Sequence, residues 1–149
     1  MRRLTERFTV PAMADEAIDT VGSALAFARV HAADAFSIKV TKHGGMLPTR
    51  KVATIAEAAG ISMFGGTMLE SGIGTAAYAQ LFSTVRGLDW GCQLFGPLLF
   101  GDTLTTTQPE YRDFHLLVPQ GPGFGIEIDT DKLAFYRRDG ERYRAAAAH

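Results

Sequence analysis

The chain has 149 residues, of which 46% are hydrophobic and 21% charged, the balance of a globular domain large enough to bury a core. Its formal net charge is −1 and it has no basic stripe, so neither nucleic acid nor an anionic membrane is expected as a partner. A single cysteine, Cys92, excludes an intramolecular disulfide, and no signal peptide or membrane-length apolar run occurs, so we expect a cytoplasmic location.

Short apolar runs alternate with Ala-rich helical stretches along the first two thirds of the chain. After a charged opening that is expected to run directly into a strand, the first apolar run covers Thr9 to Ala14 and leads to Asp15. A helix is predicted over Thr20 to Ala33. Its apolar face comprises Val21, Leu25, Ala28 and Ala32.

The second apolar run, Ala35 to Val40, contains Lys39 near its end. Pro48 is predicted to open the next helix, and Gly60 is placed to end it as a C′ glycine. The apolar face of this helix comprises Val52, Ile55, Ala56 and Ala59.

The third run, Ile61 to Phe64, is followed by a glycine-dense loop, Gly65 to Gly74. A helix is predicted over Gly74 to Val85, and its N-terminal amides could receive an anion from the loop side. The fourth run, Leu88 to Phe95, includes Gln93.

The four strand ends lie near residues 15, 39, 65 and 93, which makes them 24, 26 and 28 residues apart. A strand, a crossover helix and two loops need about that length, so the pattern predicts parallel βα units. An open doubly wound sheet and a (β/α)₈ barrel both fit this alternation. The glycine pairs lack the third glycine of a dinucleotide loop, and polar residues follow several strands, so the pattern favours the barrel.

The remaining residues have a different character. Tyr111 to Pro119 is predicted to be a strand, Ile126 to Asp129 extends again after a Gly/Pro turn, and a short helix begins near Asp131, capped by Asp129 or Thr130. Ala145 to His149 are expected to fray. The predicted fold class is therefore α/β, with about four βα units, half of a (β/α)₈-type barrel, plus a C-terminal β-hairpin and a short helix.

Two strand ends carry side chains suited to chemistry. A carboxylate such as Asp15 can ligate a hard divalent cation, although capping the following helix is an equally good reading. Lys39 closes an apolar strand, so its ammonium is expected to reach the mouth of a pocket, where it could act as an acid, a base or a cation for a substrate carboxylate. Lys42 and His43 are expected to be solvated loop residues.

Four blocks of sequence together resemble the muconate and chloromuconate cycloisomerases of the enolase superfamily. They are Met13 to Glu16, Ile38 to Gly45, Gly65 to Gly74 and Trp90 to Pro97. The resemblance extends over essentially the whole chain and identifies residues 1–100 as the C-terminal part of the superfamily barrel. It implies that residues 101–149 pack against a capping domain.

The resemblance also implies a site. Asp15 would be the third ligand of a Mg²⁺ or Mn²⁺ ion, and Lys39 a catalytic cation opposite a Lys-x-Lys pair. Thr67 and Gln93 would bind a small carboxylate substrate, a dienoic acid that closes to a lactone. Where muconate cycloisomerases generally carry a glutamate on the final strand this chain has Gln93, a neutral amide that cannot ion-pair with a lysine, which is compatible with a chloromuconate-type variant.

The Lys-x-Lys strand and the first two acidic ligands of the family pattern do not occur in this sequence. Since a (β/α)₈ barrel takes about 250 residues, we expect half an enzyme that is inactive alone. Its inner face and sheet edges would be covered by a missing N-terminal half or by self-association. The alternatives are a non-catalytic half-barrel module and the same half of another superfamily enzyme, such as a dipeptide epimerase or o-succinylbenzoate synthase.

Overall fold

The structure is a computed structural model that describes residues 1–139, so the fraying expected at Ala145 to His149 lies outside the described residues. In chain order its elements are α1 (Arg2–Arg7), β1 (Met13–Ala14), α2 (Val21–Arg29), β2 (Ala35–Ile38), α3 (Met46–Ala58), β3 (Ser62–Gly65), α4 (Gly72–Phe82), the 3₁₀ helix η1 (Gly96–Leu99), β4 (Tyr111–Arg112), β5 (His115–Leu116) and α5 (Thr130–Tyr136).

The core of the fold is a parallel sheet in the order β1-β2-β3. Ala14 pairs with Phe36 across β1 and β2, and Phe36 pairs with Met63 across β2 and β3. The fourth predicted strand is reduced to an isolated parallel bridge between Gly65 and Cys92. Three βα units are therefore complete and the fourth is rudimentary, which confirms the predicted partial barrel.

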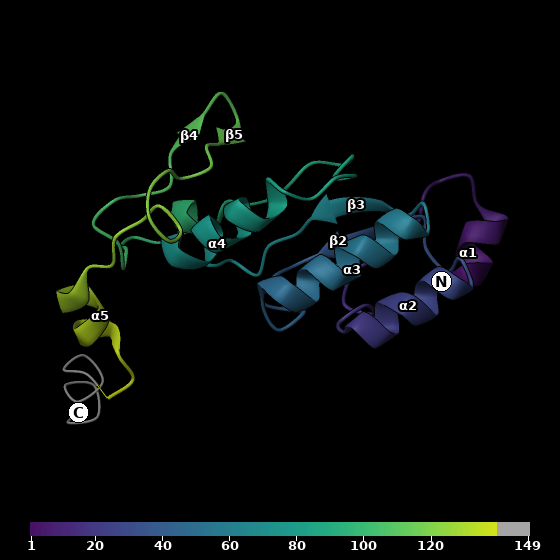
Figure 1. Cartoon of the computed structure of the whole chain (residues 1–149), viewed down its shortest axis with the longest axis horizontal. Coiled ribbons are helices and arrows are strands. Elements are labelled where there is room, and N and C mark those ends of the chain that lie inside the picture. Colours follow the sequence, from purple (N-terminus) through teal and green to yellow (C-terminus); the bar gives the residue numbers. More distant parts are fainter. Residues whose placement is uncertain (140–149) are drawn as a thin grey trace.

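Helices α2 and α3 lie side by side along one face of this sheet (Figure 1). The side chains between the helices and the strands are fully buried, among them Phe36, Ile38, Val52 and Met63. Burying side chains of this size stabilises the fold by about 1.5–3 kcal/mol each. The alternating pattern of the sequence thus reflects a real two-layer core.

The N-terminal segment differs from the prediction in two ways. Its charged opening forms the short helix α1, supported by an Arg2–Glu6 ion pair one turn apart, instead of running directly into a strand. The first strand is only two residues long. Pro11 has no N–H for a ladder, and the Ala12 N–H donates to the Asp34 carboxylate instead.

The helix boundaries shift by a few residues from those predicted. Helix α3 begins at Met46, so Pro48 lies within its first turn, where no N–H is required. Gly60 follows the helix with φ +67°, as a C′ glycine should. In α2 the prediction of Leu25 as a core residue is wrong, because Ala24 and Ala28 form the buried face and Leu25 is exposed.

The C-terminal part is an appendage to the barrel segment. The predicted strand from Tyr111 is a hairpin of two short strands, broken at Asp113 and Phe114, which both have positive φ. Thr105 pairs with Ile128 in an isolated antiparallel bridge, and Asp129 caps α5 through its carboxylate. The short helix is thus confirmed, and a C-terminal hairpin is present, but it forms within residues 111–116 instead of between Tyr111 to Pro119 and Ile126 to Asp129. The domain division at residue 100 stays a prediction.

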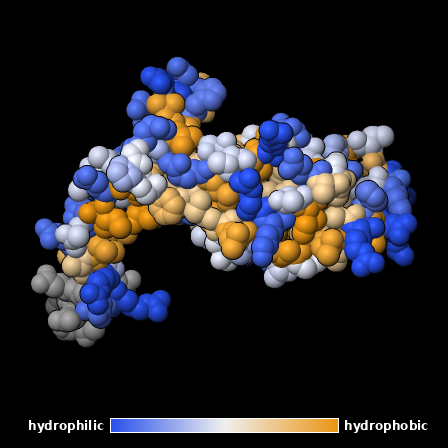
Figure 2. All heavy atoms as spheres, viewed as in Figure 1, coloured by the Kyte–Doolittle hydropathy of each residue, from blue (hydrophilic) through white to orange (hydrophobic). Residues whose placement is uncertain are grey.

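Apolar side chains are exposed on the part of the molecule between α4 and α5 (Figure 2). The exposed apolar side chains in this segment and in α5 include Leu98, Leu99, Phe100, Leu133 and Phe135. Contiguous exposed apolar surface of this kind is typical of a face that packs against further protein.

Candidate functional site

The carboxyl ends of β1 and β2 bring the two main predicted residues together. Asp15 directly follows β1 and Lys39 directly follows β2. Because Ala14 pairs with Phe36 and side chains alternate along a strand, Asp15, Ser37 and Lys39 lie on the same face of the sheet. This is the face opposite the α2–α3 layer, since Phe36 and Ile38 point into the core.

Lys39 joins both acidic residues at this edge. Its Nζ lies 2.9 Å from each carboxylate oxygen of Asp15 and 2.6 Å from Oε1 of Glu16. The Lys39 side chain is only 9% exposed, whereas that of Asp15 is 45% exposed. The lysine stem is therefore enclosed while its ammonium meets carboxylates that open to solvent.

Lys42 contributes a second ammonium to the same cluster. Its Nζ donates to the carbonyl oxygen of Asp15 at 2.8 Å, to Oδ1 of Asp15 at 3.0 Å and to the carbonyl oxygen of Ser37 at 2.8 Å. Its side chain is 4% exposed. The prediction of Lys42 as a solvated loop residue is wrong, because the turn after β2 folds it back across the two strand ends.

Burial and these hydrogen bonds shift the pKa values of Asp15, Lys39 and Lys42. Burial raises the pKa of Asp15, but hydrogen bonds from Lys39 and Lys42 outweigh it and hold the pKa below its ordinary value. Burial lowers the pKa of Lys39, but the bonds to Glu16 and Asp15 outweigh it and raise the pKa. For Lys42 burial prevails and the pKa is lowered. Lys39 is thus the group held most firmly as a cation.

Gly66 makes room for the Lys39 side chain. A Cβ at Gly66 would lie 2.9 Å from Cγ and Cε of Lys39 and 2.7 Å from Oγ of Ser37. The Gly66 N–H donates to the carbonyl oxygen of Ile38, so this backbone cannot move away without breaking a hydrogen bond between β2 and β3. The second glycine of the Gly65-Gly66 pair therefore shapes the path of the lysine.

His43 is the second residue whose predicted exposure is wrong. It is buried, with Nδ1 3.1 Å from the carbonyl oxygen of Asp19, and Nε2 has no hydrogen-bond partner among residues 1–139. Burial, more than the neighbouring Lys42, lowers its pKa. A neutral ring that fixes the turn after β2 is what this environment supports.

Thr67 lies at the end of β3, but its hydroxyl is already used. It donates to Oε2 of Glu70 at 2.6 Å and accepts from the Leu69 N–H at 3.0 Å. Oε1 of Glu70 accepts from the Met68 N–H at 2.6 Å, so this buried carboxylate organises the loop from within. Glu70 is not among the predicted site residues, and its place in a glycine-dense loop before a helix is the one sequence signal that points to it.

Gln93 follows the isolated bridge on the far side of β3. Its N–H donates to the carbonyl oxygen of Gly65 at 2.7 Å, while its side chain is exposed. The substrate-binding roles of Thr67 and Gln93, like the catalytic role of Lys39 and the ligand role of Asp15, stay predictions.

The described residues do not make up a complete cation site. Among residues 1–139 no group of three or more His, Cys, Asp or Glu side chains is placed to hold a metal ion. The carboxylates of Asp15 and Glu16 are both paired with ammonium groups. Asp15 is thus suited to be one ligand of a divalent cation but would need further acidic ligands from outside these residues.

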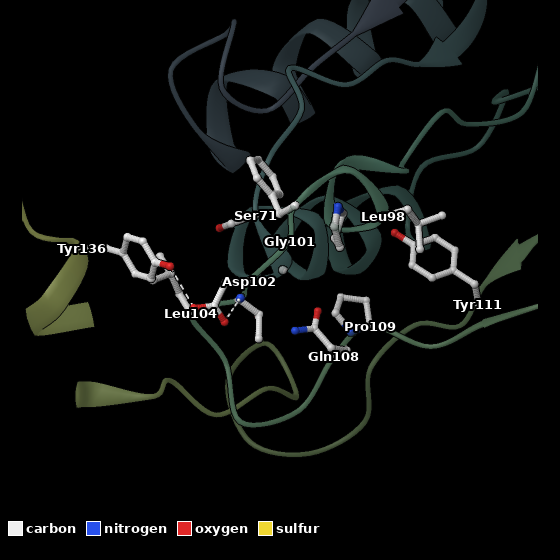
Figure 3. Close-up of a pocket in the computed structure, with 13 residues that line it drawn as sticks. Ser71, Leu98, Gly101, Asp102, Leu104, Gln108, Pro109, Tyr111 and Tyr136 are labelled. Carbon is white, nitrogen blue, oxygen red and sulfur yellow. Dashed lines mark hydrogen bonds between the residues drawn. The ribbon is translucent and has the colours of Figure 1, made fainter. Parts of the chain in front are cut away.

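A large cleft lies elsewhere, at the N-terminus of α4 (Figure 3). It has a volume of about 940 Å³, and its walls include Ser71, Leu98, Gln108 and Tyr136. Asp102 projects toward it and accepts hydrogen bonds from the Thr103 N–H and the Tyr136 hydroxyl. Asp102 is also ion-paired with Lys132, the anion site expected at the helix N-terminus stays a prediction, and the cleft does not include Asp15 or Lys39.

The sequence of this chain matches one protein family and is similar to cycloisomerases of several bacteria. The family described as "Enolase C-terminal domain-like" matches residues 1–132. A chloromuconate cycloisomerase of Pseudomonas sp. is 48% identical over 138 residues, which are 93% of this chain and 37% of that protein. A muconate cycloisomerase of Acinetobacter lwoffii is 46% identical over 140 residues, covering 94% and 37%.

Solved structures agree with these relatives. The muconate cycloisomerase of Pseudomonas fluorescens matches with a TM-score of 0.88 at 49% identity, covering 92% of this chain and 38% of its own. The 2-chloromuconate cycloisomerase of Rhodococcus opacus also has a TM-score of 0.88, at 43% identity, covering 93% and 37%. The chain therefore spans little more than a third of the relatives it matches.

None of the helices in residues 1–139 is long and apolar enough to cross a membrane.

Proposed function

The chain belongs to the enolase C-terminal domain-like family, and from this premise we propose that it is the C-terminal portion of a muconate or chloromuconate cycloisomerase. Such an isomerase closes a cis,cis-muconate to a muconolactone in the breakdown of aromatic compounds, a cytoplasmic task. The observation that carries the proposal is the contact of Lys39 with Asp15 and Glu16 at the carboxyl ends of adjacent parallel strands. This is the edge at which barrel enzymes place their active sites.

Lys39 is proposed to stabilise negative charge on the substrate. Its stem occupies the space left by the missing side chain of Gly66, its ammonium is held by Asp15 and Glu16, and its pKa is raised despite burial, so a cation stands at a defined position. Lactone closure through an enolate-like species places negative charge on the substrate carboxylate. A preorganised ammonium lowers the energy of that state without first having to reorganise.

Asp15 is proposed to be one ligand of a divalent cation, Mg²⁺ or Mn²⁺. Its carboxylate directly follows β1 and its side chain is 45% exposed, and hard cations prefer such oxygens. A bound cation would supply positive charge to hold the substrate carboxylate. The other ligands, and the lysine pair that handles the substrate proton, would come from an upstream part of the longer protein.

The remaining face of the chain is proposed to meet that upstream part. The exposed apolar residues around η1 and α5 and the open edge of β1 are surfaces that an intact barrel and its capping domain would cover. The cycloisomerase assignment is preferred to a dipeptide epimerase or an o-succinylbenzoate synthase because the relatives quoted above, at 43–49% identity, are all cycloisomerases.

The test is to complete the enzyme. The 149-residue chain is co-expressed with the complementary upstream part of the Pseudomonas fluorescens muconate cycloisomerase, and complex formation is checked by size-exclusion chromatography. We expect the purified pair, supplied with Mn²⁺, to convert cis,cis-muconate or a chloromuconate to its lactone, followed by loss of the diene absorbance. Each part alone should be inactive.

The matched variants are Lys39→Met and Lys51→Met. Lys51 is exposed on α3, so its replacement should leave turnover unchanged, whereas loss of Lys39 should lower kcat roughly 10²–10³-fold. A stable complex that turns over neither muconate nor any chloromuconate would overturn the proposal.

A further inference from the structure

Lys42 is a charged side chain that is only 4% exposed, and the chemistry proposed for Asp15 and Lys39 does not use it. An ammonium has three N–H donors. All three have acceptors here: the Asp15 carbonyl, the Asp15 carboxylate and the Ser37 carbonyl. No direction is left in which Lys42 could donate to a substrate.

The two carbonyl acceptors belong to neighbouring strands at the point where their pairing stops. β1 ends at Ala14, which pairs with Phe36, so Asp15 and Ser37 would be the next pair of the ladder. The Lys42 ammonium binds the carbonyl oxygens of both residues. It therefore links the two strand ends where the ladder of backbone hydrogen bonds has ended.

The third bond fixes the direction of the Asp15 side chain. Backbone and carboxylate of the same residue are held by one ammonium that is itself almost fully enclosed. Lys39 contacts the same carboxylate but also binds Glu16, whose side chain is largely exposed at 67%. Of the two lysines, only Lys42 is therefore anchored to the backbone of the site.

We infer that Lys42 is a positioning residue that holds the Asp15 carboxylate in one orientation and joins the ends of β1 and β2, so that Lys39 is left to face the substrate. This inference rests on the proposed function for its consequence in catalysis, but the geometry it describes belongs to the chain itself. Outer groups that orient a ligand typically change ion affinity or activity by roughly 10–100-fold when removed.

The first test uses the 149-residue chain alone and needs no turnover. Three-bond NMR couplings about χ1 of Asp15 report whether its side chain occupies one rotamer. We expect a single rotamer in the unmodified chain, in Lys51→Met and in Lys39→Met, because Lys42 remains in each. In Lys42→Met the couplings should average, since only the pairing through Lys39 remains and that ammonium is shared with Glu16.

The second test uses the completed enzyme described above. Lys42→Met should lower kcat/KM roughly 10–100-fold and raise the Mn²⁺ concentration needed for half-maximal activity, while Lys51→Met changes neither. Lys42→Gln, which keeps hydrogen-bond donors without the charge, should recover part of both losses. It also serves as the reporter if Lys42→Met fails to fold, as judged by circular dichroism.

Unchanged Asp15 couplings in a folded Lys42 variant, or a kcat/KM within twofold of the Lys51→Met control, would overturn the inference. Failure of the unmodified pair to turn over would count against the proposed function instead. In that case the coupling measurement on the chain alone still decides the position of Asp15.

Discussion

Two lysine–aspartate pairs in this chain have similar geometry and different surroundings. Lys42 and Asp15 meet at 3.0 Å at the strand ends, with the lysine enclosed, whereas Lys132 and Asp102 meet at 2.5 Å on the surface between α5 and the segment after η1. In the first pair burial is the main influence on the lysine pKa, and in the second the hydrogen bond is. Distance alone therefore does not tell which pair stabilises the fold.

The same contrast between enclosed and exposed contacts separates the barrel segment, up to Leu94, from the C-terminal segment, which begins at η1. The barrel segment has a continuous core that includes Phe36, Val52 and Tyr78, while α5 has no buried residue. The C-terminal segment is attached through a few specific points, such as Gly96 against the loop at Glu70 and the Tyr111 hydroxyl on the Leu94 carbonyl. We expect its stability to depend on these points rather than on packed area.

The largest expected effect is at Gly96. A Cβ there would lie 2.1 Å from the carbonyl oxygen of Glu70, a backbone atom that cannot rotate away. Gly96→Ala should therefore lower the free energy of unfolding by about 3 kcal/mol. Gly101→Ala is the matched control, because no atom lies within 4 Å of its Cβ position. Urea unfolding of both variants measures the difference, and equal stabilities would show that the two regions do not depend on this contact.

Breaking each ion pair tests the comparison directly. Lys42→Met leaves Asp15 with Lys39 but removes three enclosed hydrogen bonds, so we expect a loss of about 2 kcal/mol, below the range for a fully buried pair because Asp15 is half-exposed. Lys132→Met should lower the unfolding midpoint much less, because that pair is open to solvent and weakly stabilising. A larger effect from Lys132 would reverse the interpretation of the two pairs.

Two tyrosine hydroxyls sharpen the comparison. The hydroxyl of the buried Tyr78, whose pKa burial raises to about 12, accepts from the Thr41 N–H at 3.0 Å, and Tyr111, half-buried, donates to the Leu94 carbonyl at 2.7 Å. Tyr78→Phe should cost about 1.5 kcal/mol and Tyr111→Phe about 0.5 kcal/mol, because the enclosed partner is the harder to satisfy with water. Thermal unfolding measures both losses, and a larger loss for Tyr111→Phe than for Tyr78→Phe would contradict this prediction.

The smallest expected effect is the loss of stability at low pH when the Asp102 carboxylate is protonated. Hydrogen bonds from Lys132, the Thr103 N–H and Tyr136 lower the pKa of Asp102 from 3.8 to about 2. A lowered carboxyl pKa contributes stability that is present above pH 3.8 and is lost as the pH falls through about 2. The carboxyl carbon of Asp102, followed by NMR, should titrate near 2, and Lys132→Met should move the midpoint toward 3.8. Titration near 3.8 in the unmodified chain would show that the surface pair is not formed.

The sequence alone predicts the alternation of strands and helices, the helix end at Gly60 and a cap of α5 at Asp129 or Thr130, because these depend on local periodicity and on the backbone preferences of single residues. It also placed Asp15 and Lys39 at one edge, since parallel strands 24 residues apart must end on the same side. The burial of the Lys42 side chain and of His43, and the reduction of the fourth strand to one bridge, are features of the three-dimensional fold that the sequence pattern does not predict. Burial of a charge depends on which distant groups satisfy it, and Asp15, 27 residues away from Lys42, leaves no trace of that contact in the local pattern.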